Sequence, residues 1–285
     1  MSKASPVMTA ALPQIAGLGS ARPLIMGVIN ATPDSFYDGG RHTDTDGAIA
    51  HGMALLAQGA DILDVGGEST RPGADPVPEH VELDRVIPVV RALATRGAVV
   101  SIDTRNGGVM TAAADAGAKM INDVAALTRP GAMAAAADSG LPVVLLHSDA
   151  DPRNMQDAPT YDDVVAEVIA YLQGRIGACE AAGIPHDRLI ADPGIGFAKT
   201  PDHNVKLLTA LDKFQDLNVP ILLGVSRKSF IGHFSNGEAA DHRLPGSLAA
   251  ALWGATHGAK ILRVHDVSET AQAMAIWRAA SGEAL

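Results

Sequence analysis

Cysteine, aromatic residues and positive charge are all scarce in this chain of 285 residues. Its single cysteine, Cys179, excludes an intrachain disulfide and a thiolate metal site, and suits the reducing conditions of the cytoplasm. Aromatic residues make up only 4% of the chain, so a platform for stacking nucleic-acid bases is not expected. The formal net charge of −10 likewise argues against general affinity for nucleic acid or for an anionic membrane.

Long apolar runs are also missing. No segment approaches the roughly 20 apolar residues of a membrane-spanning helix, and residues 1–22 lack the pattern of a signal peptide. Hydrophobic residues nevertheless make up 47% of the chain and charged residues 19%, which indicates a packed globular protein. A single α/β barrel has about 250 residues. We therefore expect a loosely ordered N-terminal arm over residues 1–22 and one domain over residues 23–285.

Short apolar runs alternate with segments of helical periodicity. A glycine that ends a helical stretch directly before an apolar run recurs at Gly59, Gly117 and Gly258. Near-continuous apolar runs are typical of parallel strands that are covered on both faces. The predicted strands span residues 24–29, 62–65, 99–102, 120–121, 143–146, 189–191, 221–225 and 261–264.

Apolar residues at helical spacing lie between several of these strands. Ile49, Met53 and Leu56 form one such stripe, and Cys179 lies on another, where we expect it to be buried. Eight alternating strand–helix units favour a closed (β/α)8 barrel in a single domain. Periodicity alone leaves an open, doubly wound sheet as the alternative.

Polar residues follow every predicted strand. These residues are Asn30, Asp64, Asp103, Asn122, Asp123, His147, Asp192, Ser226, Arg227, Lys228, Arg263 and His265. A single polar residue in such a position is ordinary for a solvated loop. Because all strands of a barrel end on one face, where active sites form, the repeated pattern instead predicts a functional face.

Cations gather after the last two predicted strands. Arg227 and Lys228 follow the seventh strand, and Arg263 and His265 lie at the end of the eighth. In barrels, the loops after these two strands are a common phosphate site. The sequence therefore predicts an acidic protein with a local cationic cluster for a ligand that carries diphosphate.

Two long segments follow the first and second predicted strands. Residues 30–40 include Phe36 and are interpreted either as a lid or as a helix-capping loop. In residues 64–73, paired glycines followed by Thr70 and Arg71 predict a cradle for an anion rather than a flexible loop that Pro72 closes.

A third segment follows the sixth predicted strand. There Asp192 can accept two parallel hydrogen bonds from an amidine-like edge, such as that of a 2-aminopyrimidinone ring. Phe197 is placed to form a wall beside such a ring. The plainer reading of this aspartate is an Asx-type turn.

Seven strings of residues resemble the motifs of the dihydropteroate synthase family and occur in the same order. They begin at Asn30, Asp64, Ser101, Ile121, Asp192, Ser226 and Arg263. The resemblance covers roughly residues 22 to 268. It implies a (β/α)8 barrel. It also implies that the protein is an alkyl- or aryl-group transferase, which joins 6-hydroxymethyl-7,8-dihydropterin diphosphate to 4-aminobenzoate. It also implies a magnesium ion, a cytoplasmic homodimer and sensitivity to sulfonamides, which mimic 4-aminobenzoate.

The resemblance further implies roles for individual residues. Asn30 would bind the magnesium ion. The residues expected to act in catalysis are Lys228, Arg263, His265, Arg71 and Asp103. The residues expected to bind the two substrates are Thr70, Asp103, Asn122, Asp192, Phe197, Lys228, Arg263, His265, Ser226, Phe36 and Pro72.

The chain departs from the family after the fifth predicted strand. The family commonly has Met-His-Met there, whereas this chain has Leu146, His147 and Ser148, so a serine replaces a methionine expected near the pterin. Two alternative functions share a pterin-binding barrel. One is a methyltetrahydrofolate-dependent corrinoid methyltransferase, which does not need the cationic cluster, and the other is a non-catalytic pterin-binding homologue.

Overall fold

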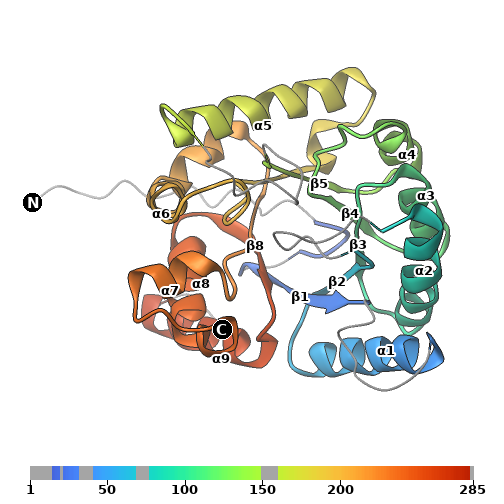
Figure 1. Cartoon of the computed structure of the whole chain (residues 1–285), viewed down its shortest axis with the longest axis horizontal. Helices are drawn as coiled ribbons and strands as arrows, with labels where there is room; N and C mark the ends of the chain where they lie inside the picture. The colour runs from blue at the N-terminus through green and yellow to red at the C-terminus, as the bar shows by residue number, and fades with distance from the viewer. Residues whose placement is uncertain (1–14, 20–21, 32–40, 69–76, 149–159, 283–285) are drawn as a thin grey trace, which may run out of the picture.

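The computed structural model describes residues 15–19, 22–31, 41–68, 77–148 and 160–282. Within them, eight parallel strands close into a barrel in which each strand pairs with the next and β8 pairs with β1. The helices form a ring around this barrel (Figure 1). The predicted (β/α)8 barrel is thus confirmed, and the open sheet is wrong.

The strands are short, as parallel barrel strands usually are. They are β1 (Leu24–Asn30), β2 (Ile62–Gly66), β3 (Val100–Asp103), β4 (Met120–Asp123), β5 (Val143–Leu146), β6 (Leu189–Asp192), β7 (Ile221–Leu223) and β8 (Ala259–Val264). β7 ends two residues before its predicted end, and β1, β2, β3, β4 and β6 run one or two residues further than predicted. β8 begins two residues before its predicted start.

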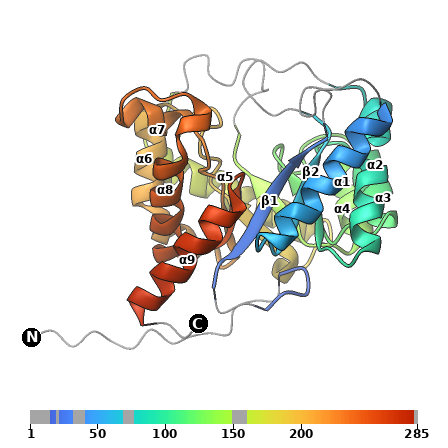
Figure 2. The ribbon, with the colours of Figure 1, turned by 90° about the horizontal axis from the view of Figure 1, so that it is seen from below.

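The α-helices of the outer ring follow the strands in order. They are α1 (Arg41–Ala57), α2 (Glu79–Thr95), α3 (Gly107–Asp115), α4 (Ala132–Ser139), α5 (Val164–Ala181), α6 (Pro201–Thr209), α7 (Ser229–Phe234), α8 (Leu244–Thr256) and α9 (Val267–Ser281). Short 3₁₀ turns are η2 (His186–Arg188), η3 (Leu211–Leu217) and η4 (Ala240–His242). α1 and α9 flank β1 on either side (Figure 2).

Side chains that face the barrel interior change from apolar to polar along the strands. The apolar ones pack together at the lower end of the barrel; among them are Met26, Ile62, Met120, Val144, Ile190, Leu222 and Ile261. Because a strand repeats every two residues, the side chains two positions later face the same interior. In β2, β4, β6 and β8 these are Asp64, Asn122, Asp192 and Arg263. The barrel therefore has an apolar floor beneath a polar mouth.

This alternation corrects the predicted placement of two polar residues. Asp64 lies inside β2, where it pairs in register with Ser101, and Arg263 lies inside β8 opposite Met26 of β1. Both residues were predicted at strand exits. Backbone pairing continues past both residues because their charges find partners inside the barrel, Asp64 with Arg263 and Arg263 with Asp64 and Asp103.

A second apolar core lies between the strands and the surrounding helices. Cys179 belongs to this core, as predicted. In α1, however, the buried face carries Ala48, Gly52 and Leu55, while the predicted stripe residue Met53 is 38% exposed. The buried face is displaced by one residue because Gly52 lets α1 approach its neighbours closely.

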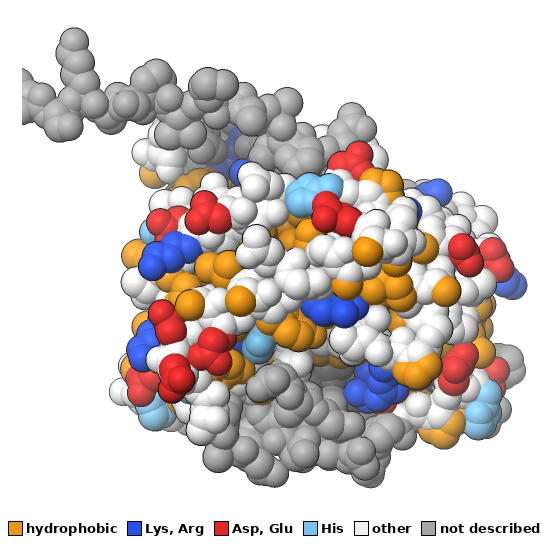
Figure 3. Space-filling model, turned by 90° about the horizontal axis from the view of Figure 1, so that it is seen from above, with side chains coloured by type: hydrophobic (Ala, Val, Ile, Leu, Met, Phe, Trp, Pro, Cys, Tyr) orange, Lys and Arg blue, Asp and Glu red, His pale blue; other side chains and the backbone are white. Residues whose placement is uncertain are grey.

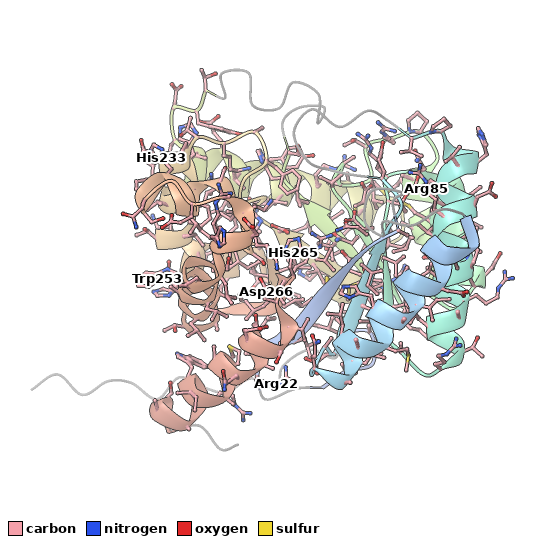
Figure 4. The ribbon with its side chains drawn as sticks, turned by 60° about the horizontal axis from the view of Figure 1, so that its bottom comes forward. Arg22, Arg85, His233, Trp253, His265 and Asp266 are labelled. Atoms are coloured by element: carbon pink, nitrogen blue, oxygen red, sulfur yellow. The ribbon has the colours of Figure 1, made fainter. Side chains whose placement is uncertain are left out.

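The segment before β1 packs in part against the lower end of the barrel. Ile15 is 5% exposed and packs against the apolar floor. Its backbone forms hydrogen bonds with the backbone of Leu18. Near the start of β1, Arg22 forms an ion pair with Asp61 at 2.6 Å (Figure 4). The described part of the predicted N-terminal arm is therefore attached to the domain.

Neither the described helices nor the face of the molecule in Figure 3 has the features of a membrane-spanning or nucleic-acid-binding protein. No helix in the described ranges has the length and apolar character that crossing a membrane requires. On the face shown in Figure 3, acidic, basic and hydrophobic side chains are interspersed over the coloured part. This face does not present the broad positive surface that nucleic-acid binding requires.

The close contact at Gly52 gives a test of the packing. A Cβ at this position would lie 2.9 Å from Ile29 Cδ1 and 2.9 Å from Leu93 Cδ2, so Gly52→Val must displace both. We expect it to lower the free energy of unfolding by about 1–3 kcal/mol, as overpacking usually does. Urea denaturation measures this change.

The matched control is Ala54→Val on the exposed face of the same helix. We expect it to change stability by about 0.5 kcal/mol or less, because surface substitutions rarely do more. Equal effects of the two substitutions would contradict the close contact at Gly52 as the source of the cost.

Candidate active site

An arginine held by two carboxylates is the centre of the barrel mouth. Arg263 donates from Nε to Asp64 Oδ2 and from Nη2 to Asp103 Oδ2, each at 2.7 Å. Asn122 donates to the same oxygen of Asp64 at 3.0 Å. The network therefore joins β2, β3, β4 and β8, and orients the polar side chains that face the pocket.

The two carboxylates change the protonation properties of this network. Burial alone would lower the pKa of Arg263, but Asp64 and Asp103 raise it above its ordinary value, so the guanidinium remains charged. Burial raises the pKa of Asp103 to about 7, against the opposing effect of Arg263. Asp103 therefore titrates near neutral pH, a property common in functional sites.

A pocket opens above this network. Most of the predicted substrate-binding residues that the structure describes meet there, although they come from different strands. The pocket is lined by Asp103, Asn122, Val124, Leu146, Asp192, Ile195, Phe197, Gly224, Ser226, Lys228, Arg263 and His265. The lining combines charged groups with apolar walls, which is typical of a site for a polar, flat ligand.

Asp192 and Lys228 face each other in this pocket. Asp192 is 3% exposed, and its Oδ1 accepts the Gly194 N–H at 2.7 Å. Burial raises the pKa of Asp192 to about 6, against that hydrogen bond and Lys228. Burial and Arg263 lower the pKa of Lys228 to about 8. Between these values the pocket offers one ionised acceptor and one ionised donor.

Lys228 also has an aromatic partner. Its Nζ lies 4.1 Å from the centroid of the Phe197 ring, within the range of a cation–π contact. Phe197 comes from the turn after β6, whereas Lys228 follows β7. The two segments thus place an apolar ring and a cation on one wall of the pocket.

His265 lies beyond the end of β8, beside Asp266 (Figure 4). The hydroxyl of Ser226 accepts the His265 backbone N–H at 3.2 Å and lies 3.0 Å from Nδ1 of the ring. The Ser226 hydroxyl therefore fixes both the backbone and the ring of His265. Burial, Arg263 and Arg227 lower the pKa of His265 to about 4, so the ring is neutral at pH 7.

Arg227 does not join the predicted cationic cluster in the pocket. Its guanidinium forms an ion pair with Asp266, and its backbone N–H donates to Ser247 at 2.8 Å. Of the cations expected after the last two strands, Lys228 and Arg263 line the pocket. Two neighbouring cations in sequence therefore have different partners because the backbone turns between them.

Five further predicted residues have other placements. Asn30 is half-buried at the end of β1, beside Gly66 of β2, and does not line the pocket. Phe36, Thr70, Arg71 and Pro72 lie outside the described residues.

Two residues at the mouth were missed or misplaced by the sequence reading. Asp64 was absent from the predicted site, although it is fully buried and holds both Arg263 and Asn122. A carboxylate inside an apolar run was the available signal. Leu146, the last residue of β5, lines the pocket, whereas Ser148 does not, so the wall there remains apolar.

The chain is similar to known proteins over nearly its whole length. A family model described as pterin binding enzyme matches residues 26–265. The dihydropteroate synthase of Escherichia coli K12 is 50% identical over 260 residues, which cover 91% of this chain and 92% of that protein.

Solved structures show the same relationship. The Xanthomonas albilineans dihydropteroate synthase with 4-aminobenzoic acid superposes with a TM-score of 0.90 at 49% identity, over 97% of this chain and 100% of that one. The Yersinia pestis dihydropteroate synthase in complex with a sulfonamide drug gives 0.88 at 47% identity, over 93% and 98%. With this similarity in both sequence and fold, the chain belongs to the dihydropteroate synthases within the family of pterin-binding enzymes.

Proposed function

We propose that this protein joins 6-hydroxymethyl-7,8-dihydropterin diphosphate to 4-aminobenzoate, forming 7,8-dihydropteroate and releasing diphosphate. The observation that carries the proposal is the meeting of Asp192, Asn122 and Lys228 in one pocket beside Arg263. A pterin presents an amidine-like edge and a ring carbonyl, which need an ionised acceptor and a cationic donor. Relatives at about half identity have this activity in their names, which supports the same assignment here.

The pterin ring is held by groups of opposite character. Asp192 accepts hydrogen bonds from the 2-amino group and N3, and Lys228 donates to the carbonyl side. Phe197 forms a wall against the ring, Asn122 contacts its edge, and Arg263 stacks on the opposite face. Asp103, when ionised, stabilises the positive charge that the ring gains during the reaction.

The reaction breaks one bond and forms one. The bond between the pterin methylene and the diphosphate oxygen breaks, and its electron pair leaves with diphosphate. The electron-rich dihydropterin stabilises the cationic methylene. The aryl amine of 4-aminobenzoate then forms a carbon–nitrogen bond to the methylene and loses a proton.

Several groups of the chain bind the leaving diphosphate. Arg263 and Arg71 supply positive charge, and the neutral His265 donates a hydrogen bond from its ring. Ser226 lines the pocket, and the resemblance to the family assigns Thr70, Phe36 and Pro72 to the binding of 4-aminobenzoate together with it. Under this proposal, different residues bind the diphosphate and the 4-aminobenzoate, so the two substrates occupy separate parts of the barrel mouth.

A magnesium ion fits the oxygen chemistry of this mouth. Asn30 offers one amide oxygen at the end of β1, and no group of His, Cys, Asp and Glu able to hold a metal occurs in the described ranges. Magnesium usually binds through one or two protein oxygens together with substrate phosphates and water. Asn30 would hold the ion in the presence of diphosphate, and the ion supplies charge neutralisation to that group.

No observation favours either alternative function. The cationic residues Lys228 and Arg263 are both present in the pocket, and a methyltetrahydrofolate-dependent corrinoid methyltransferase does not need them. Within the described ranges, all predicted site residues except Asn30 line the pocket. A loss of site residues, which would indicate a non-catalytic homologue, is therefore not seen among them.

The protein acts as a homodimer in the cytoplasm under this proposal. Large apolar side chains remain exposed on neighbouring helices, with Val205 of α6 at 37% and Trp253 of α8 at 46%. Trp253 is fixed by a hydrogen bond from its ring N–H to the Leu208 carbonyl at 2.9 Å. Ordered apolar groups of this kind suit a subunit interface.

The direct test is diphosphate release by the purified protein. We expect release to require magnesium and both substrates, and to stop on addition of excess EDTA because the diphosphate charge is then not neutralised. Circular dichroism should be unchanged by EDTA, which separates loss of the ion from loss of the fold. Full turnover in excess EDTA would contradict the magnesium site, and no release under any condition would contradict the reaction.

The pKa values of the pocket predict a bell-shaped pH profile of kcat/KM for the pterin substrate. Below about pH 6 Asp192 takes up a proton and no longer accepts two hydrogen bonds, and Asp103 adds to this limb from about 7. Above about pH 8 Lys228 loses its proton and its cationic contact. The profile should therefore fall on both sides of a maximum between these values.

Lys228→Arg identifies the alkaline limb. A guanidinium stays protonated throughout this range, so the variant should lose the fall above about pH 8 even though its kcat/KM is lower overall. An alkaline limb that stays in place in this variant would assign the titration to another group.

Inhibition by a sulfonamide tests the second substrate site. A sulfonamide resembles 4-aminobenzoate in shape and charge, so we expect inhibition that is competitive with 4-aminobenzoate and not with the pterin diphosphate. Steady-state inhibition at varied 4-aminobenzoate measures this. We propose that Phe36, Thr70 and Arg71 complete this site only after pterin diphosphate has bound, so calorimetry on the unliganded protein should show weak binding. Tight binding without ligand would contradict this ordered assembly.

A further inference from the structure

The exit of β5 and the turn after β6 are joined by a buried lysine that has no role in the chemistry above. Lys199 is 2% exposed. Its ammonium lies 3.0 Å from His147 Nδ1, 3.3 Å from the His147 carbonyl and 2.9 Å from the Phe197 carbonyl. These three contacts match the three donors of an ammonium group. Since a buried charge is costly without such partners, the position is built for a cation.

His147 is a fixed acceptor in this arrangement. Burial, with the Lys199 ammonium adding to it, lowers the pKa of His147 to about 3, so its Nδ1 keeps a lone pair at neutral pH. The ring is packed edge-on against Tyr171, with centroids 4.8 Å apart, and lies 6.2 Å from Tyr161. The imidazole therefore cannot move away from the ammonium without breaking these contacts.

The turn that precedes Lys199 lies close to the same neighbours. Gly194 and Gly196 have φ values of 70° and 81°, which few residues other than glycine adopt. A Cβ on Gly194 would lie 1.9 Å from the His147 carbonyl oxygen, and one on Gly196 would lie 2.8 Å from Lys228 Cδ. The turn thus runs between the β5 exit on one side and Lys228 on the other.

Phe197 lines the pocket from this turn, as does Ile195. Its ring lies under the ammonium of Lys228, and its carbonyl is the oxygen that Lys199 binds. The next carbonyl, of Ala198, accepts a hydrogen bond from the Tyr161 hydroxyl at 2.9 Å. Contacts to the backbone at Phe197 and Ala198 therefore determine where the Phe197 ring stands.

We propose that Lys199 is a positioning residue for pterin binding, because it ties the Phe197 carbonyl to the exit of β5. In this role Lys199 holds the Phe197 ring against the pterin and beneath Lys228 without touching the ligand. The inference rests on the proposed function, since it takes the ligand of the pocket to be a pterin.

The test is Lys199→Met, which keeps an unbranched apolar stem and removes all three donors. We expect the KM for pterin diphosphate to rise on the order of tenfold, because two carbonyls and an imidazole lose their buried donor. The KM for 4-aminobenzoate should stay within about twofold, and kcat should change less than the pterin KM. Calorimetry with 6-hydroxymethylpterin should show the same loss of affinity without any turnover.

Two variants accompany this test. Lys213→Met removes an exposed lysine of η3 and should leave all these values unchanged. Lys199→Gln keeps two N–H donors on a shorter side chain, so its pterin KM should lie between those of the wild type and Lys199→Met. This graded order distinguishes lost donors from a general loss of structure, which would affect both substrates alike.

A folded Lys199→Met protein with an unchanged pterin KM and unchanged pterin affinity would overturn the proposal. If that variant does not fold by circular dichroism, Lys199→Gln decides the question by the same measurements. Failure of the proposed function is seen separately, as a wild-type protein that binds 6-hydroxymethylpterin but releases no diphosphate. The effect of Lys199 on pterin affinity can still be measured in that case.

Discussion

The contact between Arg263 and the two carboxylates of Asp64 and Asp103 determines the form of the barrel mouth. A guanidinium at this depth needs charged partners, because burial of an unpaired ion costs several kcal/mol. Asp64 is fully buried and satisfies both Arg263 and Asn122 through one oxygen. Removal of Arg263 would leave the fully buried Asp64 without its cationic partner, so the residues of the network depend on one another.

Closure of the barrel makes this network achievable. Arg263 and Asp64 are 199 residues apart, and they meet because β8 pairs with β1 and β1 with β2. The apolar floor below them excludes water from the lower interior, as the packing of Met26, Ile62 and Ile261 shows. The charges at the mouth therefore act in a medium of low dielectric constant on one side and face the ligand on the other.

The same burial sets the charge state of the pocket before a ligand arrives. Asp192 and Lys228 have pKa values moved toward each other, to about 6 and about 8, so both are ionised over a narrow range around neutral pH. His265 is neutral at that pH, which leaves the positive charge to the lysine and arginine residues. This explains how a chain with a net charge of −10 can bind an anionic substrate: the positive charge is local and held by buried partners.

Much of the fold and several site residues could be predicted from the sequence alone. Short apolar runs separated by helical segments predict parallel strands that alternate with helices, because strands covered on both faces need apolar residues at nearly every position. Closure of the sheet was not determined by this pattern. Asp103, Asn122 and Asp192 were visible because each comes directly after such a run. Lys228 and His265 were visible because they stand in cationic strings after the last two strands.

Tertiary structure decided the features that depend on residues far apart in the chain. Periodicity could not show that Gly52, rather than Met53, faces the core, because that choice depends on the side chains of β1 and α2 that meet α1. Nor could it show that Asp64 is the partner of Arg263 or that Leu146, not Ser148, lines the pocket. The apolar runs and the chemical types at the strand ends are local properties of the sequence, whereas pairing, burial and the resulting pKa values are set by the neighbours that barrel closure brings together.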